Sequence, residues 1–317
     1  MRIRLALAIL VGLVVPAAAQ PLATGMQEVR VTQGGIARSY VVYRPAREGS
    51  LPLVVMLHGA GGRARQALEN YRWDRLADRE GFVVAAPQGL PARPRAAASL
   101  VFNPNVWNDG SERFTPERRA IDDVAFVAAV IDNVASRAAI DRTRVYVAGM
   151  SNGASMAFRV ASRMPERFAA VAAVAGHFWD PPARIAPPLS LLLIAGERDP
   201  LNPLAGGNGR DPWGGGTIAK PPMIRSAQAW AAAVGCRAET EPNHPDLPPQ
   251  LIHMPPQGVR WTGCPPGTAV VMMTIHGMGH VWPGAVRELP ERLVGPRPAN
   301  FDATRGIWAF LRPHRRA

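Results

Sequence analysis

One glycine-flanked segment carries the residue type needed for nucleophilic catalysis. Gly149, Met150, Ser151, Asn152 and Gly153 spell GxSxG. The motif follows an apolar, β-branched run and precedes a helical pattern. In that setting a sharp strand-to-helix turn lifts the serine hydroxyl out of a sheet. We therefore predict that Ser151 is a nucleophile rather than a residue of a structural turn.

A serine hydroxyl is a weak nucleophile at neutral pH, so it needs a neighbouring base, and the base needs an orienting carboxylate. On a turn of this kind the acid and then the histidine follow the serine along the chain. Asp199 comes just past the apolar run 191–195, and we predict it as the acid, with Glu197 as its nearest rival. The other downstream candidates lie in proline- or glycine-rich loops or near a helix start: Asp180, Asp211, Asp246 and Asp302.

Two histidines follow the apolar run 270–275, and either could be the base. His276 adjoins the run, whereas His280 comes after Gly277 and Gly279 on a loop that can reach back over a sheet. We predict His280 as the base. The HxxxH spacing would suit a metal only on a helix, and the glycines oppose one, so no metal site is predicted. The remaining histidines are predicted to be structural or solvent-exposed: His58, His177, His244, His253 and His314.

A developing oxyanion needs preorganised hydrogen-bond donors. One predicted donor is the backbone N–H of Asn152, and the other is that of Ala60, in the run HGAGG at 58–62. The same run could be a tight turn that merely needs glycine. A phosphate cradle is excluded because such a loop requires Lys followed by Ser or Thr, where this chain has Arg63 and Ala64.

The elements that would position these residues alternate along the chain. Short apolar runs predict buried strands, and apolar residues at spacings of three and four predict helices. Alternation of this kind implies right-handed crossovers and a mostly parallel central sheet with helices on both faces, an α/β fold. The predicted strands are 39–44, 53–57, 82–86, 145–148, 171–175, 191–195 and 270–275, and the predicted helices are 121–138, 154–164, 223–234 and 303–311.

Two stretches interrupt the alternation. Residues 201–222 are rich in glycine and residues 242–266 in proline, and neither predicts regular structure. Long loops in compact domains are often functional, so each stretch is either a functional insertion or a surface insertion without a role. We predict one catalytic domain over 20–317 that contains both insertions.

The first 19 residues have the order of a secretory signal peptide. Arg2 and Arg4 precede an apolar run at 5–15 and three alanines at 17–19. The run is too short for a membrane-spanning helix, which needs about 20 residues. We therefore predict cleavage after residue 19 and a secreted protein, extracellular or periplasmic. Export would let Cys236 and Cys264 form a disulfide, the alternative being two free buried thiols.

The chain carries a strongly positive net charge, and almost all of its basic residues are arginine. Lys220 is the only lysine, so 36 minus 1, or 35, of the basic residues are Arg, and the net charge of +12 becomes 12 minus 2, or +10, after export. The arginines are scattered, which favours a compositional bias over nucleic-acid binding. An anionic polymer remains a possible partner. At 47% hydrophobic residues, the chain can bury a large core.

Five motifs together resemble the secreted esterases grouped as polyhydroxybutyrate depolymerases and feruloyl or acetylxylan esterases. They are LHGAGG at 57–62, DDV at 122–124, VYVAGMSNG at 145–153, DP at 199–200 and GHVWPG at 279–284. The resemblance spans about 39–310 and implies an α/β-hydrolase fold, a triad of Ser151, Asp199 and His280, and no cofactor. It also suggests that Trp107 and Trp282 line the acyl or sugar site, although both could be packing residues.

Other parts of the resemblance are weaker. Asp122 and Asp123 are interpreted as helix-start acids that suit the helix dipole. Ala154 stands where the family has a second glycine, and Ala195 where its acid turn has His. Substrate preference is therefore not inherited from any one member.

The residues and the resemblance together predict a secreted serine ester hydrolase that works through an acyl-enzyme. Its substrate would be a polyester or the feruloyl or acetyl esters of a polysaccharide. The alternatives are a non-catalytic secreted binding protein on the hydrolase fold and a serine peptidase. The alcohol, the polymer and the oligomeric state are left open.

Overall fold

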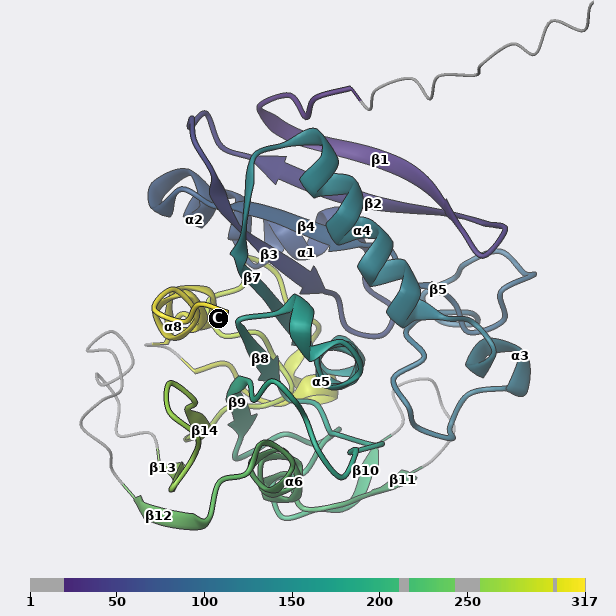
Figure 1. The fold of residues 1–317 in the computed structure, drawn as a ribbon. Helices are drawn as coiled ribbons and strands as arrows, with labels where there is room; N and C mark the ends of the chain where they lie inside the picture. The colour runs from purple at the N-terminus through teal and green to yellow at the C-terminus, as the bar shows by residue number, and fades with distance from the viewer. Residues whose placement is uncertain (1–19, 211–216, 243–256, 299–300, 317) are drawn as a thin grey trace, which may run out of the picture.

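The computed structural model describes residues 20–210, 217–242, 257–298 and 301–316. Its centre is a ten-stranded sheet in the order β1-β2-β4-β3-β7-β8-β9-β14-β13-β12 (Figure 1). These strands are β1 (Gly25–Gln33), β2 (Ile36–Arg44), β3 (Leu51–Leu57), β4 (Val83–Pro87), β7 (Ile140–Met150), β8 (Ala170–Val174), β9 (Ser190–Gly196), β12 (Ala238–Pro242), β13 (Gln257–Thr262) and β14 (Val270–Ile275).

The middle of the sheet is parallel and its two edges are antiparallel. Strands β4, β3, β7, β8, β9 and β14 pair in parallel. Strands β1 and β2 extend one side antiparallel, and β13 and β12 extend the other. Because the carboxyl ends of the parallel strands share one edge, the loops that follow β3, β7, β9 and β14 come together there.

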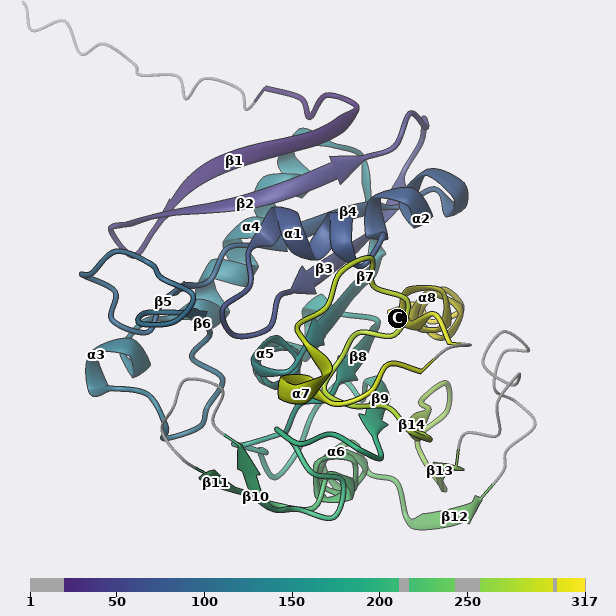
Figure 2. The same cartoon turned by 180° about the vertical axis from the view of Figure 1, so that it is seen from behind.

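Helices cover both faces of the sheet, as predicted (Figures 1 and 2). Residues of α4, α5 and α6 belong to one buried cluster, and residues of α1, α2 and α8 to the other. The helices are α1 (Ala64–Asn70), α2 (Trp73–Glu80), α3 (Pro116–Arg119), α4 (Asp123–Arg137), α5 (Asn152–Arg163), α6 (Ile224–Val234), α7 (Glu291–Val294) and α8 (Ala303–Leu311), with a 3₁₀ turn at Pro165–Arg167.

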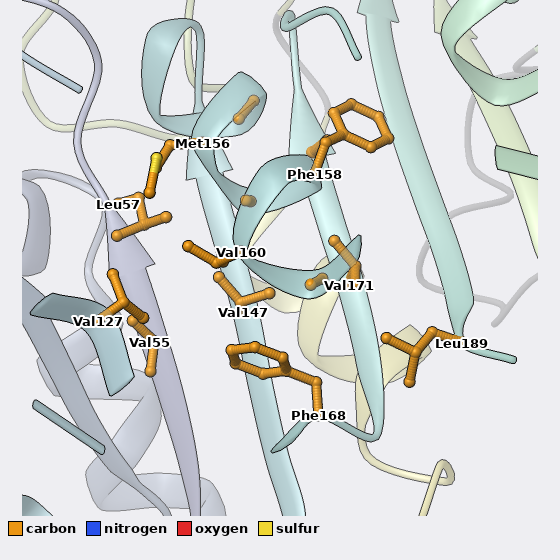
Figure 3. Packing of buried hydrophobic residues seen from close by; sticks show 14 of the residues in the cluster. Val55, Leu57, Val127, Val147, Met156, Phe158, Val160, Phe168, Val171 and Leu189 are labelled. Atoms are coloured by element: carbon orange, nitrogen blue, oxygen red, sulfur yellow. The ribbon is translucent and has the colours of Figure 1, made fainter. Parts of the chain in front are cut away.

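Strand β3 shows why the strands read as continuous apolar runs. All its residues are buried, and successive side chains enter opposite clusters, Val55 on the α4–α5 side and Val54 on the α1–α2 side. Under α5, Val147 of β7 lies beside Val160 of the helix (Figure 3). Because both faces of such a strand are covered, its sequence lacks the alternation of apolar and polar residues that marks a half-exposed strand.

Several elements differ from the sequence prediction. Strand β1 was not predicted, because an edge strand with mixed exposure carries few buried residues. Helices α1 and α2, each no longer than eight residues, were also missed. The ends of the proline-rich stretch 242–266 belong to β12 and β13, which pair with each other and extend the sheet. The stretch 201–222 contains a two-stranded hairpin, β10 (Gly207–Arg210) and β11 (Thr217–Lys220).

The proposed signal peptide at 1–19 lies outside the described residues. Across the part of the chain that the structure describes, no helix combines the length and the apolar character that crossing a bilayer requires.

Candidate active site

Ser151 sits on a strained turn between β7 and α5. Its backbone has φ 55° and ψ −120°, an unusual conformation for a residue with a side chain. A Cβ at Gly149 would lie 2.2 Å from the carbonyl oxygen of Gly153, and one at Gly153 would lie 2.2 Å from that of Leu57. Both motif glycines are therefore required by close backbone approach, which is the physical content of GxSxG here.

A continuous hydrogen-bond chain joins Ser151, His280 and Asp199. The Ser151 Oγ lies 2.8 Å from His280 Nε2, and His280 Nδ1 lies 2.7 Å from Asp199 Oδ2. His280 and Asp199 are 8% and 4% exposed. The other Asp199 oxygen accepts the backbone N–H groups of Leu201 and Asn202, both at 2.8 Å. The carboxylate is thereby fixed in position and orients the imidazole.

The fold brings Asp199 and His280, the candidate acid and base, together because they follow neighbouring strands. Strands β9 and β14 pair in parallel, with Gly196 opposite Ile275, so the loops that carry Asp199 and His280 leave the same end. The base loop is anchored by α7, since the N–H of His280 donates to the carbonyl of Val294. A Cβ at Gly279 would meet that same carbonyl oxygen at 2.2 Å.

Glu197 and His276, the nearest rivals of Asp199 and His280, pair with each other instead of with Ser151. His276 Nδ1 lies 2.8 Å from Glu197 Oε2, in a pair whose side chains are 78% and 43% exposed. Asp180 pairs with Arg159 and Arg163. Asp302 accepts the N–H of Arg305 as the N-cap of α8, and Asp211 and Asp246 lie outside the described residues.

The loop at 58–62 lies against the nucleophile turn. A Cβ at Gly59 would be 3.5 Å from the Ser151 Cβ. Within this loop the N–H of Gly61 donates to Asn105 and the N–H of Gly62 to Gly59. No acceptor within the described chain engages the N–H of Ala60. Its N–H is thus the donor that the loop leaves uncommitted.

Asn152, which carries the second predicted donor, is held by its side chain. Its Oδ1 accepts the N–H of Trp107 at 2.7 Å, and its Nδ2 donates to Asp109 Oδ2 at 2.7 Å. Asp109 is fully buried and also accepts from Ser111 and pairs with Arg113. Sequence reasoning missed Asp109, because no spacing relative to Ser151 marks an acid that reaches the site from a separate loop.

The predicted lining tryptophans occupy the core instead. Trp107 is completely buried, and its Nε1 donates to the carbonyl of His58 at 2.8 Å. Trp282 is 1% exposed, donates to Thr304 Oγ1 at 2.9 Å and stacks on Tyr71 with ring centroids 4.4 Å apart. These contacts correct the expectation that both line the acyl site and favour the packing interpretation. Trp282 of the GHVWPG motif is therefore a buried residue of the segment that carries His280.

Asp122 and Asp123 both stand at the start of α4, as interpreted from the sequence, and Asp123 has further partners. Asp122 caps α4 by accepting the N–H of Ala125. Asp123 is buried, pairs with Arg38 at 2.9 Å and Arg118 at 2.6 Å, and accepts the N–H of Asn108. It is therefore both a helix-start acid and the centre of a buried ionic cluster. Arg118 lies five positions before it, whereas Arg38 comes from a distant strand that no local pattern connects.

Three histidines outside the hydrogen-bond chain are held neutral by burial. Burial lowers the pKa of His58 to about 4, and His58 Nε2 accepts the N–H of Gly89 at 3.0 Å. Burial also lowers the pKa of His314 to about 4. The pKa of His177 falls to about 3, first through burial and then through the charges of Lys220, Arg113 and His280.

The glycine-rich insertion contributes to the surroundings of the base. Lys220, the only lysine, ends β11 and places its ammonium 5.3 Å from the ring centroid of Trp179. Trp179 in turn lies 5.0 Å from the His177 ring. The β10–β11 hairpin thus brings a positive charge to the loop that follows β8.

A second carboxyl group lies near the base. Glu288 Oε1 accepts the N–H of Trp282 at 2.9 Å. Burial raises the pKa of Glu288 to about 7, and the charge of His280 acts in the opposite direction. The sequence offered no signal for it, because it follows no strand.

The structure contains the Cys236–Cys264 disulfide, which links the end of α6 to the segment after β13. The described residues contain no group of three or more His, Cys, Asp or Glu side chains arranged to hold a metal ion.

The sequence is similar to those of known esterases. A family model described as Esterase PHB depolymerase matches residues 38–187. The putative esterase NocK of Nocardia uniformis subsp. tsuyamanensis is 31% identical over 292 residues, covering 88% of this chain and 81% of that protein. Poly(3-hydroxyalkanoate) depolymerase C of Paucimonas lemoignei is 32% identical over 125 residues, 39% of this chain and 28% of that protein.

A solved structure shares the fold. The acetyl xylan esterase from Aspergillus awamori superposes with a TM-score of 0.53 at 15% identity, covering 84% of this chain and 97% of that one. At this identity the likeness concerns the arrangement of strands and helices alone.

Proposed function

The chain belongs to the Esterase PHB depolymerase family of carboxylic ester hydrolases and has the α/β-hydrolase fold. From this premise we propose that it is a secreted serine esterase whose triad is Ser151, His280 and Asp199. The observation that carries the proposal is the hydrogen-bond chain through the three side chains, at 2.8 and 2.7 Å. Distances of this size are within reach of direct proton transfer.

The proposed reaction has two acyl-transfer steps. His280 Nε2 takes the Ser151 proton as Oγ bonds to the ester carbonyl carbon, and the backbone N–H groups of Ala60 and Asn152 stabilise the oxyanion. His280 then gives the proton to the leaving alcohol oxygen as the carbon–oxygen bond breaks. In the second step His280 removes a proton from water, which attacks the acyl-enzyme and releases the acid and the free serine.

The proposed substrate is a polyester or a feruloyl or acetyl ester of a polysaccharide. Its support is that relatives bear the names poly(3-hydroxyalkanoate) depolymerase, acetylxylan esterase and feruloyl esterase. We further propose that residues 20–317 form one catalytic domain with insertions near 201–222 and 242–266. Export would remove residues 1–19, so the mature protein would begin at Gln20, which N-terminal sequencing of the exported protein tests.

The decisive assay compares wild type with Ser151→Ala on nitrophenyl acetate, a feruloyl ester, hydroxybutyrate oligomers and a peptide. Ser136→Ala, on the exposed side of α4, is the matched control. We expect ester cleavage by wild type and by Ser136→Ala, and loss of cleavage in Ser151→Ala. A wild type that cleaves only the peptide would overturn the esterase hypothesis. Activity that survives in Ser151→Ala would overturn the assignment of Ser151 as the nucleophile.

A further inference from the structure

A pocket of about 200 Å³ lies between α2 and α8, apart from the hydrogen-bond chain of the active site. The two helices are neighbours on the face of the sheet that also carries α1 (Figures 1 and 2). The pocket is lined by Arg72, Arg75, Leu76, Arg79, Asp302, Thr304 and Arg305. Four arginines from two distant segments therefore line one small volume.

The spacing of the arginines explains why they converge. Arg75 and Arg79 are four positions apart on one face of α2, Arg72 is the N-cap of that helix, and Arg305 comes from the first turn of α8. The floor is neutral, because Leu76 is buried and the Thr304 hydroxyl is engaged with Trp282 and the carbonyl of Tyr71. The arginines that form the walls of the pocket are charged and exposed to solvent, whereas the floor of the pocket is neither.

Within the described residues, none of these four guanidinium groups forms an ion pair. Elsewhere the arginines find carboxylates, as Arg38 and Arg118 do at Asp123. The acids of α2 are directed to other partners, Asp78 to the Tyr43 hydroxyl and Glu80 to Trp308 Nε1. Asp74, the third acid of α2, is half-buried; burial raises its pKa, and the neighbouring charge of Arg75 acts in the opposite direction without forming an ion pair with it.

One carboxylate does line the pocket. Asp302 is the N-cap of α8 and accepts the N–H of Arg305 at 3.0 Å, so its charge interacts favourably with the helix terminus. Its single negative charge stands against four positive ones. Like charges on one helix face repel each other, and a bound anion would relieve that repulsion.

We propose that the α2–α8 pocket binds a multiply charged oxyanion, either a phosphate or a polycarboxylate. Guanidinium groups are planar forks that hold such oxygens in pairs. The positive end of the α8 dipole points to the same place. The site uses none of the residues of the proposed triad, so it stands independently of the proposed function. It also gives the positive charge of the chain a specific location.

The test is isothermal titration of the full exported chain with inorganic phosphate and, separately, with citrate, at constant ionic strength. The pocket variant is Arg75→Ala with Arg305→Ala. The control is Arg30→Ala with Arg225→Ala, which removes the same charge from exposed positions elsewhere. We expect one saturable site, weakened at least tenfold in the pocket variant and unchanged in the control. Cleavage of nitrophenyl acetate by each variant serves as a check on folding.

The two ligands identify the chemistry. Tighter phosphate binding assigns a phosphate site, and tighter citrate binding assigns a carboxylate site. The proposal is overturned if neither ligand saturates, or if the pocket and control variants weaken binding equally, since that would reflect net charge alone. Arg75→Gln with Arg305→Gln repeats the test with longer side chains, in case the alanine pair fails to fold.

Discussion

The catalytic edge and the α2–α8 pocket use charge in opposite ways. At the catalytic edge Asp199 and His280 are buried and paired at 2.7 Å, and glycines stand where a Cβ has no space. In the pocket, four arginines and a single carboxylate, Asp302, line a solvent-accessible volume, and the arginines form no ion pair within the described residues. The first region depends on exact backbone fit, so single changes should be severe. The second depends on summed charge, so single changes should be mild.

The largest expected effect tests the catalytic edge. Asp199→Asn keeps an oxygen for the N–H groups of Leu201 and Asn202 but no longer favours the required imidazole tautomer, so kcat on a soluble ester should fall roughly 10⁴-fold. Arg305→Ala, as the pocket control, should stay within about twofold of wild type. An Asp199→Asn enzyme that retains a tenth of wild-type kcat would contradict the proposed role.

The next effect concerns the buried ionic cluster beside the catalytic edge. Asp123→Asn leaves two buried guanidinium groups, those of Arg38 and Arg118, without their counter-charge, and should lower the unfolding free energy by about 3–5 kcal/mol. The neighbouring change Asp122→Ala removes only a helix cap and should cost about 1 kcal/mol. Urea unfolding measures both. Equal costs would show that the cluster adds nothing beyond capping.

A smaller effect depends on pH. His58, His177 and His314 have folded-state pKa values lowered to about 4, 3 and 4, so their stabilising contribution is complete above their unfolded pKa near 6.5. As pH falls below 6.5 the unfolded chain binds protons first, and each group should remove up to about 1.4 kcal/mol of unfolding free energy per pH unit.

Urea unfolding at several values from pH 7 to pH 4.5 measures this slope. His314→Gln should make the slope shallower, because one of the three depressed groups is absent. The pocket guanidinium groups stay charged throughout this range, so the pH response should come from the imidazoles. An unchanged slope in His314→Gln would exclude that residue from the response.

The smallest effect tests the tolerance of the pocket. Arg75→Ala changes an exposed side chain without an ion-pair partner among the described residues, so in phosphate-free buffer the unfolding free energy should stay within about 0.5 kcal/mol of wild type. Thermal unfolding measures the difference. A loss of several kcal/mol would mean that the guanidinium group is part of the packing, and the contrast between the two regions would weaken.

Much of the fold could be predicted because buried strands and amphipathic helices carry local patterns. The parallel core, from β3 to β14, follows from short apolar runs alternating with helices. Strand β1 and the β12–β13 hairpin were missed, since edge strands are defined by pairing with neighbours. Cross-strand pairing is a long-range property, and proline in the hairpin region obscured what remained of the pattern.

The candidate site divides in the same way. The sequence could single out Ser151, Ala60 and Asn152 as candidates because tight turns need particular residues in consecutive positions. Asp109 could not be singled out, because it reaches the site through a contact with Asn152, 43 positions along the chain. Glu288 could not either, because it follows no strand and no motif marks its contact with Trp282. Trp282 shows the opposite error, since a residue within a recognisable motif proved to be a core residue.

The sequence by itself determined the sharp turn at Ser151 and its flanking glycines, because these depend on local backbone geometry, and it set the order in which the candidate acid and base follow. Only the tertiary structure decided that His276 pairs with Glu197 at the surface while His280 meets Asp199 in the interior. It also decided that Arg305 joins three arginines of α2 around one pocket. Charges interact through space, and their partners are known only once distant segments are packed together.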